Sequence, residues 1–184
     1  MGALIIEVSA VILIIYGVII LSGKKFVIPK LIERIYWLFV LWAGFITSSI
    51  VEGRISIAIL IISGLFFIIY MILNEKNKYI ICNVNSEQII EIIREYLTFK
   101  GVKIAQEKNE LILSGRYKGK INIDCNFSSI VINLKMIDKK IRLNLLRHIK
   151  IELNKFKGKK YSLEGYIYIF IGLIVIFIFA RKTL

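Results

Sequence analysis

The sequence predicts an α-helical integral membrane protein of about four transmembrane helices, with a small α+β domain inserted between the third and the fourth. Three observations predict this fold class. The chain is 57% hydrophobic with a mean hydropathy of +0.72, above the apolar share of about 45–50% found in ordinary soluble domains. Its apolar residues are concentrated in four blocks. A stretch of ordinary soluble composition, residues 74–160, separates the last two blocks.

Two of the blocks are uncharged and long enough to cross a bilayer as helices. Crossing a hydrocarbon core of about 30 Å takes roughly 20 apolar helical residues. The uncharged runs Ile35–Val51 and Ile55–Leu73 meet this requirement, so we expect spans at about 33–51 and 55–73. Only a short charged turn separates the two runs, which predicts a tight antiparallel hairpin.

The first and last blocks carry weaker signals. Residues 2–22 contain Glu7, and a carboxylate inside a membrane span is a functional candidate by default. Its place near the start of the chain favours a hydrated glutamate at the interface instead. The last block, within 161–184, has an apolar run only from Gly165 to Ala180. We expect it to span the bilayer, with a re-entrant or interfacial segment as the alternative.

Positive charges in the loops predict the orientation, because cytoplasmic loops are richer in Lys and Arg. Lys24, Lys25 and Lys30 lie between the first two spans, whereas the next loop carries Arg54 alone. The first connection is therefore predicted to be cytoplasmic, with the N-terminus outside and residues 74–160 in the cytoplasm. The expected localisation is the plasma membrane, as a multi-pass protein. The abundance of Ile, Lys and Asn suits AT-rich codons and hence a bacterial source.

Residues 74–160 are predicted to form the basic cytosolic α+β domain, with the element order β-α-β-β-β-β-α. Alternation of apolar and polar residues indicates strands, and a capping pattern at Asn85 followed by a helical period indicates a helix that ends before Gly101. The expected strands cover about 79–84, 102–106, 110–114, 120–125 and 130–134, and the expected helices cover about 86–100 and 138–157. Both helices are expected on one face of a mostly antiparallel two-layer sheet.

The other face of this sheet is predicted to be polar, and it is a candidate binding surface. A two-layer domain shows the same polar face to water, so the alternative of simple solvation stays open. The residues expected on the polar face are Lys103, Lys120, Asn122, Asp124, Asn133 and Lys135. The expected inward positions include Ile80, Cys82, Val84, Ile121, Ile123 and Cys125. Both cysteines are expected to be reduced and buried as small apolar residues.

No motif in the sequence indicates catalysis, a metal or a cofactor. His148 is the single histidine, and no zinc-ligand spacing, GxSxG or HExxH pattern accompanies it. The segment Gly115–Gly119 lacks the Lys-Ser/Thr ending of a phosphate-binding loop and does not open a helix. We therefore expect a protein that is not an enzyme and that needs neither a cofactor nor a metal ion.

Basic residues in and after the second predicted helix are the expected contact surface for an anionic lipid or a partner. Residues 74–160 hold 19 Lys and Arg against 9 Asp and Glu, so they carry +10 of the formal net charge of +13. The predicted contact residues are Lys139, Lys140, Arg147, Lys150, Lys155, Lys157, Lys159 and Lys160. The alternative is that lysines beside a membrane span only fix its topology and contact no specific partner, and this alternative stays open.

These patterns favour a non-enzymatic integral membrane protein whose basic module binds a protein partner or an anionic membrane surface, in regulation or assembly. The expected partners are the lipid bilayer, with anionic lipids among its components, and a protein partner or a second copy of the chain. Nucleic acid is disfavoured because no recognition motif accompanies the basic charge. The alternative function is a subunit of a membrane transport system, with a path lined by the first three spans.

Overall fold

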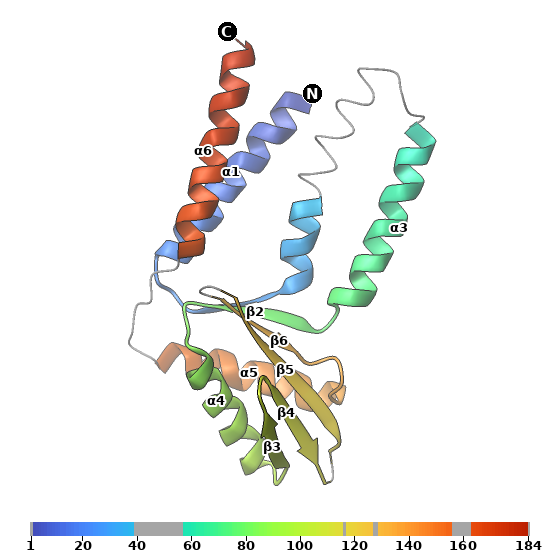
Figure 1. Cartoon of the computed structure of the whole chain (residues 1–184), viewed down its shortest axis with the longest axis vertical. Helices are drawn as coiled ribbons and strands as arrows, with labels where there is room; N and C mark the ends of the chain where they lie inside the picture. The colour runs from blue at the N-terminus through green and yellow to red at the C-terminus, as the bar shows by residue number, and fades with distance from the viewer. Residues whose placement is uncertain (1, 39–56, 116, 127–128, 156–162, 184) are drawn as a thin grey trace. The chain divides into compact units, whose positions relative to one another are not determined.

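A computed structural model describes residues 2–38, 57–115, 117–126, 129–155 and 163–183 (Figure 1). The chain divides into two compact units. The helical unit comprises Met1–Ile19, Leu31–Lys76 and Glu164–Leu184, and the α/β unit comprises Ile20–Lys30 and Asn77–Leu163.

The helical unit contains helices α1 (Gly2–Leu21), α3 (Ile57–Glu75) and α6 (Leu163–Thr183), and residues 30–38 form a further helical stretch. Helices α1 and α6 pack antiparallel and very closely, because glycines lie at their contact. A Cβ atom at Gly17 would lie 2.7 Å from the carbonyl oxygen of Gly165, and one at Gly172 would lie 2.9 Å from the carbonyl oxygen of Ala10. Only glycine therefore fits these two positions without a shift of the backbone.

The predicted transmembrane architecture is contradicted by the structure. Within the described residues, no helix is long and apolar enough to cross a membrane. Apolar side chains of α1, α3 and α6 are well exposed, as Phe66 of α3 is at 75%.

This correction extends to every prediction that depended on membrane spans. The fold class of about four transmembrane helices is contradicted, as judged from the described parts of the spans expected at 2–22, 33–51, 55–73 and 161–184. So are the plasma-membrane localisation with its outside N-terminus and the membrane-protein function, together with its transport alternative. The predicted hairpin turn at residues 52–54, residues 39–51 of the second span and residues 55–56 of the third lie outside the described residues.

The α/β unit is built on one antiparallel sheet, to which the described residues contribute six strands in the order β1-β2-β6-β5-β4-β3. Its strands are β1 (Phe26–Pro29), β2 (Lys78–Cys82), β3 (Lys103–Glu107), β4 (Glu110–Ser114), β5 (Gly119–Asn126) and β6 (Ser129–Asn133), and its helices are α4 (Ser86–Phe99) and α5 (Lys139–Lys155). Between residues 78 and 155 the elements follow the expected order β-α-β-β-β-β-α.

Strand β1 is the element that the sequence analysis missed. It pairs antiparallel with β2, so that Phe26 lies opposite Cys82 and Pro29 opposite Tyr79. Four residues that end in proline carry too little alternation to be recognised as a strand. Because β1 lies between two segments of the helical unit in the chain, its place in the sheet depends on pairing with a strand about 50 residues away, which local sequence patterns do not reveal.

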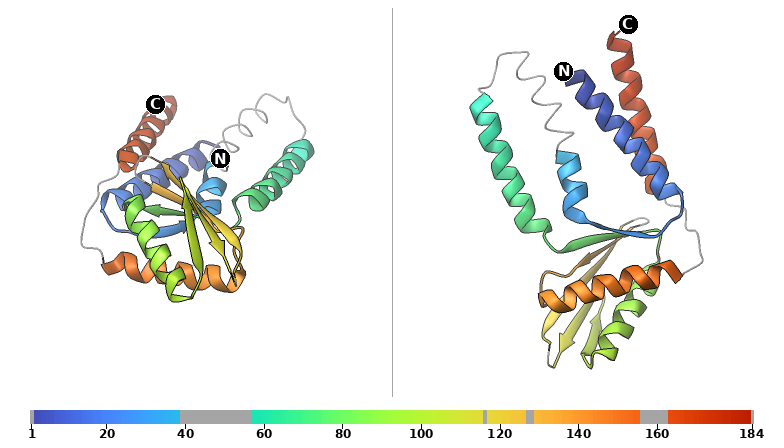
Figure 2. Two further views of the ribbon diagram at one scale, coloured as in Figure 1. Left: turned by 60° about the horizontal axis from the view of Figure 1, so that its bottom comes forward. Right: turned by 180° about the vertical axis from the view of Figure 1, so that it is seen from behind.

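Both helices pack on the same face of the sheet, as predicted. The view from behind in Figure 2 shows α5 crossing in front of the strands. The core between helices and sheet joins α4, α5 and the inward positions of the strands, and its fully buried side chains include Ile81, Ile89, Ile93, Leu97, Leu111, Ile121, Ile132, Leu145 and Ile149. Helix α4 begins with the predicted capping box, in which Asn85 and Gln88 each bond the backbone of the other.

The helix-free face of the sheet is apolar at one end and polar at the other. Ile80, Cys82 and Val131 form a small buried cluster with Phe26 beside them, whereas β3, β4 and β5 present charged and amide side chains. Strand parity puts Lys103, Lys120, Asn122, Asp124 and Asn133 on this face, which confirms those predictions. Lys135 follows the end of β6.

Two predicted inward positions are corrected by this register. Ile80 and Cys82 lie on the helix-free face, because Ile81 is the residue of β2 that joins the main core. All of β2 from Ile80 to Cys82 is buried, so alternation could not show which side faced the helices. Cys82 is buried as expected, but Cys125 is exposed.

Candidate functional site

Helix α5 holds most of the predicted contact residues that the structure describes. Asp138 caps its first turn, because the Asp138 Oδ1 atom accepts hydrogen bonds from the backbone N–H groups of Lys140 and Ile141 at 2.8 and 3.4 Å. A carboxylate at this position also suits the positive end of the helix dipole. The helix therefore begins one residue later than the predicted start at residue 138.

One stripe of α5 fixes the helix on the sheet. Ile141, Leu145, Ile149 and Leu153 recur every four residues and are at most 8% exposed. Burying a side chain of this size contributes about 1.5–3 kcal/mol, so the helix is held at several points along its length. The outward face of α5 therefore keeps one orientation relative to the sheet.

The outward face combines cations with apolar side chains. Lys140, Leu143, Arg147 and Lys150 follow each other at spacings of three or four residues, and Ile151 lies four residues after Arg147, which places all five along one side of the helix. All five are exposed, and Leu143 and Ile151 are 53% and 51% exposed. We call these five residues the α5 ridge. Sequence analysis found its cations but not the two apolar residues, because Leu143 and Ile151 interrupt the basic face rather than extend the apolar stripe.

The charge of α5 is strongly one-sided. Residues 139–155 contain six Lys or Arg and one acid, Glu152. Glu152 is engaged by Lys155, whose Nζ atom lies 2.6 Å from the Glu152 Oε1 atom. Among the described residues, no ion pair involves Lys140, Arg147 or Lys150. The ridge is therefore a surface of uncompensated positive charge.

The other predicted contact residues have different positions. Lys139 is exposed at the start of α5, and Lys155 is exposed at its end. Lys157, Lys159 and Lys160 lie outside the described residues. Glu7 belongs to α1 in the helical unit and is partly exposed, so it shares no site with α5.

His148 packs between the two helices. Its ring centroid lies 5.2 Å from that of Tyr96 on α4, and its buried Nε2 atom has no hydrogen-bond partner within the described part of the chain. Burial raises the pKa of Tyr96, and the nearby Tyr117 raises this pKa further. The ring contact joins α4 to α5.

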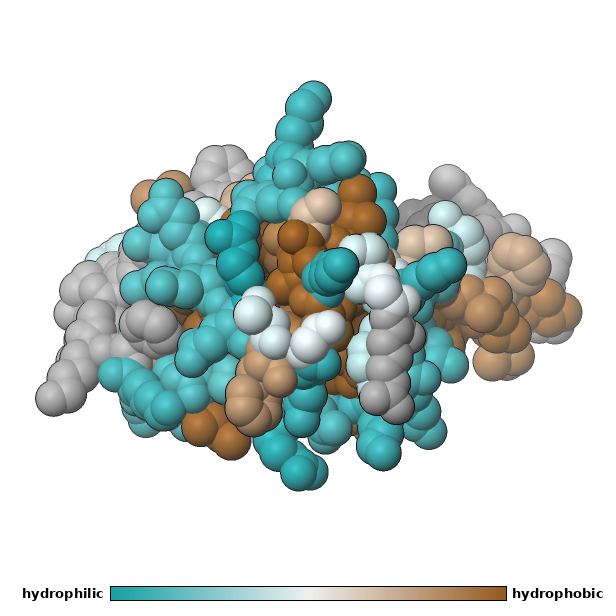
Figure 3. Space-filling view, turned by 90° about the horizontal axis from the view of Figure 1, so that it is seen from below, coloured by the Kyte–Doolittle hydropathy of each residue, from teal (hydrophilic) through white to brown (hydrophobic). Residues whose placement is uncertain are grey.

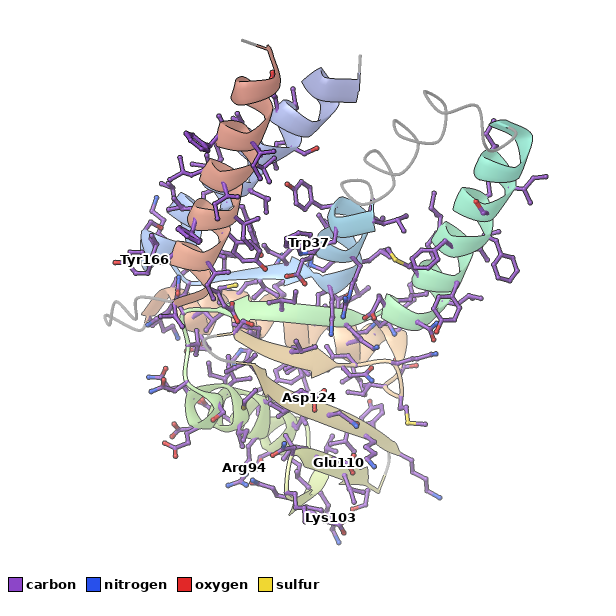
Figure 4. The ribbon with its side chains drawn as sticks, turned by 45° about the horizontal axis from the view of Figure 1, so that its top comes forward. Trp37, Arg94, Lys103, Glu110, Asp124 and Tyr166 are labelled. Atoms are coloured by element: carbon purple, nitrogen blue, oxygen red, sulfur yellow. The ribbon has the colours of Figure 1, made fainter. Side chains whose placement is uncertain are left out.

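The polar end of the helix-free face is a second cluster of charged groups (Figure 4). The Glu110 carboxylate accepts a hydrogen bond from Asn122 Nδ2 at 3.0 Å and pairs with the ammonium of Lys120. Asp124 lies on the same strand as those partners and is exposed. Within the residues described, no three His, Cys, Asp or Glu side chains are placed to hold a metal ion. Within the cluster, Glu110 is thus engaged by Asn122 and Lys120.

The surface of the molecule seen from below has mostly hydrophilic residues, with apolar areas between them (Figure 3). On α5 the exposed cations alternate with the exposed apolar side chains Leu143 and Ile151. The α5 ridge is therefore the candidate functional site. Comparison of the chain with protein-family models, curated proteins and solved structures found no match.

Proposed function

We propose that the α/β unit is a non-enzymatic binding module that docks an acidic protein surface on the α5 ridge. The observation that carries the proposal is the alternation of unpaired cations with exposed apolar side chains along one rigid helix. The apolar residues supply the dry centre that a specific protein interface needs, and the cations supply complementary charge around it.

Arg147 is the expected centre of the interface. It lies between Leu143 and Ile151 on the ridge, four residues from each, and it is exposed. Arginine beside apolar anchors is a common source of binding energy, because its planar guanidinium bonds a carboxylate at two points. The buried stripe of α5 already fixes the helix, so docking requires little ordering of the backbone.

A protein partner fits this ridge better than a lipid surface or a nucleic acid. The segment 139–155 contains no Trp, Phe or Tyr. Helices that lie in a lipid interface usually insert aromatic residues, and single-stranded nucleic acids usually stack their bases on them. The apolar anchors on the ridge are aliphatic and isolated, which suits shallow pockets on a folded partner.

The test uses a synthetic helical peptide that carries a leucine stripe flanked on both sides by glutamates. Binding of this peptide to the whole chain is measured by fluorescence anisotropy at several salt concentrations. We expect the double variant Arg147→Glu, Lys150→Glu to weaken binding by about ten-fold or more, since each reversal turns an attraction into a repulsion. Leu143→Ser is expected to weaken binding several-fold even at high salt, because the apolar contact is not screened.

The matched control is Lys108→Glu, which reverses one exposed charge in the β3–β4 turn, away from α5. This variant is expected to change affinity less than two-fold. Duplex DNA and vesicles with anionic lipid serve as competing probes. The proposal would be contradicted if Lys108→Glu lowered the affinity as much as the ridge variants do, or if Leu143→Ser left the affinity unchanged. Tighter binding of the chain to DNA or to the vesicles than to the peptide would also contradict it.

A further inference from the structure

The α/β sheet has two edges, and they differ in their capacity to accept another strand. Strand β1 forms one edge and ends at Pro29, which has no backbone N–H group to donate. Strand β3 forms the other edge. Four of its five residues are exposed, and among the described residues nothing pairs with its outer side. An open edge of this kind presents a row of N–H and C=O groups to any strand that approaches.

The sequence of β3 is self-complementary in charge. It reads Lys-Ile-Ala-Gln-Glu, with Lys103 at one end, Glu107 at the other and Ala105 in the middle. A second copy of the strand, placed antiparallel about a two-fold axis at Ala105, would set Lys103 opposite Glu107 twice. A lysine on an edge strand usually prevents pairing, but here each lysine would meet a carboxylate, and opposite charges on facing residues stabilise a sheet.

The surroundings of Glu107 strengthen this complementarity. Its cross-strand neighbour within the sheet is Glu110, so two carboxylates lie side by side at this end of β3. Like charges that face each other on adjacent strands are unfavourable, and Lys120 offsets only the Glu110 side. An incoming lysine next to Glu107 would therefore relieve an existing repulsion.

Helix α4 holds the edge strand β3 in place. The Arg94 Nη2 atom of α4 donates a hydrogen bond to the Gln106 Oε1 atom of β3 at 2.5 Å. Figure 4 shows Arg94 and Lys103 near the end of the unit formed by β3 and α4. This contact ties the edge strand to the helix that packs behind it, so β3 is presented as an ordered strand.

We propose that two copies of this chain associate through their β3 strands, antiparallel about a two-fold axis at Ala105, to form one continuous sheet. The interface is isologous, because the same five residues serve both copies. The occupant of the β3 edge is thus a second copy of the chain. This association does not depend on the partner proposed for the α5 ridge.

The first experiment tests the register by cross-linking the whole chain with the exposed Cys125 replaced by serine. Facing Cα atoms in an antiparallel pair lie about 4.5–5.5 Å apart, within the range of about 4.4–6.8 Å that a disulfide spans. We expect Ala105→Cys to form a covalent dimer under mild oxidation, visible on a non-reducing gel and lost on reduction. Gln106→Cys is the control, because two copies of residue 106 would lie about 8 Å apart, offset by two residues along the strand.

The second experiment tests the charge pairing by measuring the mass of the chain in solution by sedimentation. We expect the unmodified chain to be dimeric, and Lys103→Glu and Glu107→Lys each to shift it at least ten-fold toward monomer. The double variant, which exchanges the two charges, is expected to restore the dimer and to exclude misfolding as the cause. A monomeric unmodified chain, a double variant that stays monomeric, or cross-linking at position 106 in place of 105 would overturn the proposal.

Discussion

Replacement of Asn83 by alanine tests how the segment that leads into β1 is joined to the sheet. Asn83 follows β2, is 1% exposed and has a φ of 63°. Its side-chain Nδ2 atom donates to the backbone carbonyls of Ile20 and Lys24 at 2.9 and 2.8 Å. These two bonds link the β2–α4 turn to the residues that lead into β1.

The cost of Asn83→Ala follows from three contributions. Two carbonyl groups lose their donor, at about 1.5 kcal/mol each. Alanine in the left-handed region costs about 1 kcal/mol more than asparagine, which tolerates positive φ. The Oδ1 atom of Asn83 is buried without a hydrogen-bond partner among the described residues, so its removal returns about 1 kcal/mol. The net loss of stability is about 3 kcal/mol.

Two matched variants separate these contributions. Asn77 has a similar φ of 67° and is partly exposed, so Asn77→Ala should lose only the conformational part, about 1 kcal/mol. Asn83→Gly relieves the backbone strain but still removes both donors, and it should lose about 2 kcal/mol. The expected order of destabilisation is therefore Asn77→Ala, Asn83→Gly and Asn83→Ala.

The assay is the rate at which Cys82 reacts with a thiol reagent, in a chain with Cys125→Ser. Cys82 is 2% exposed and lies next to Asn83, so it reacts only when this part of the sheet opens. When closing is faster than labelling, the rate follows the opening equilibrium, and 3 kcal/mol corresponds to about a 150-fold increase. A rate in Asn83→Ala no greater than in Asn77→Ala would show that the two hydrogen bonds do not hold the segment.

Two further predictions concern the helical unit and the α4–α5 contact. Gly17→Ala is expected to lower the melting temperature, even though alanine favours helices by about 1 kcal/mol over glycine, because its Cβ would lie 2.7 Å from the Gly165 carbonyl oxygen; an unchanged or higher melting temperature would contradict the close α1–α6 contact. The raised pKa of Tyr96 means that the folded chain retains this proton above the ordinary pKa of 10.0, so the associated stability is present below pH 10 and is lost as the pH rises through the folded pKa. Urea titrations between pH 9 and 11 should therefore show a steeper fall for the unmodified chain than for Tyr96→Phe, and parallel curves would refute this assignment.

Local sequence patterns predicted the part of the fold that depends on short-range physics. Strand β5 alternates cleanly between apolar and polar residues from Lys120 to Asp124, because one of its faces meets the core and the other does not. The cap at Asn85 and the period of α5 likewise depend on neighbours within a few residues. The cations of the α5 ridge followed from the same reading, since a helix has one buried side and the charges must lie on the other.

Features of the fold that depend on contacts between residues far apart in the sequence were decided by the tertiary structure alone. Strand β1 exists because β2 and β6 build a sheet beside it, and Asn83 anchors it through two contacts that cross about 60 residues of chain. The side of β2 that meets the helices could not be read from Tyr79–Cys82, because almost every residue there is apolar. Hydropathy also predicted membrane spans that the described helices do not form. It measures how apolar a segment is, and an apolar helix can equally meet another helix, as α1 meets α6 at Gly17 and Gly172.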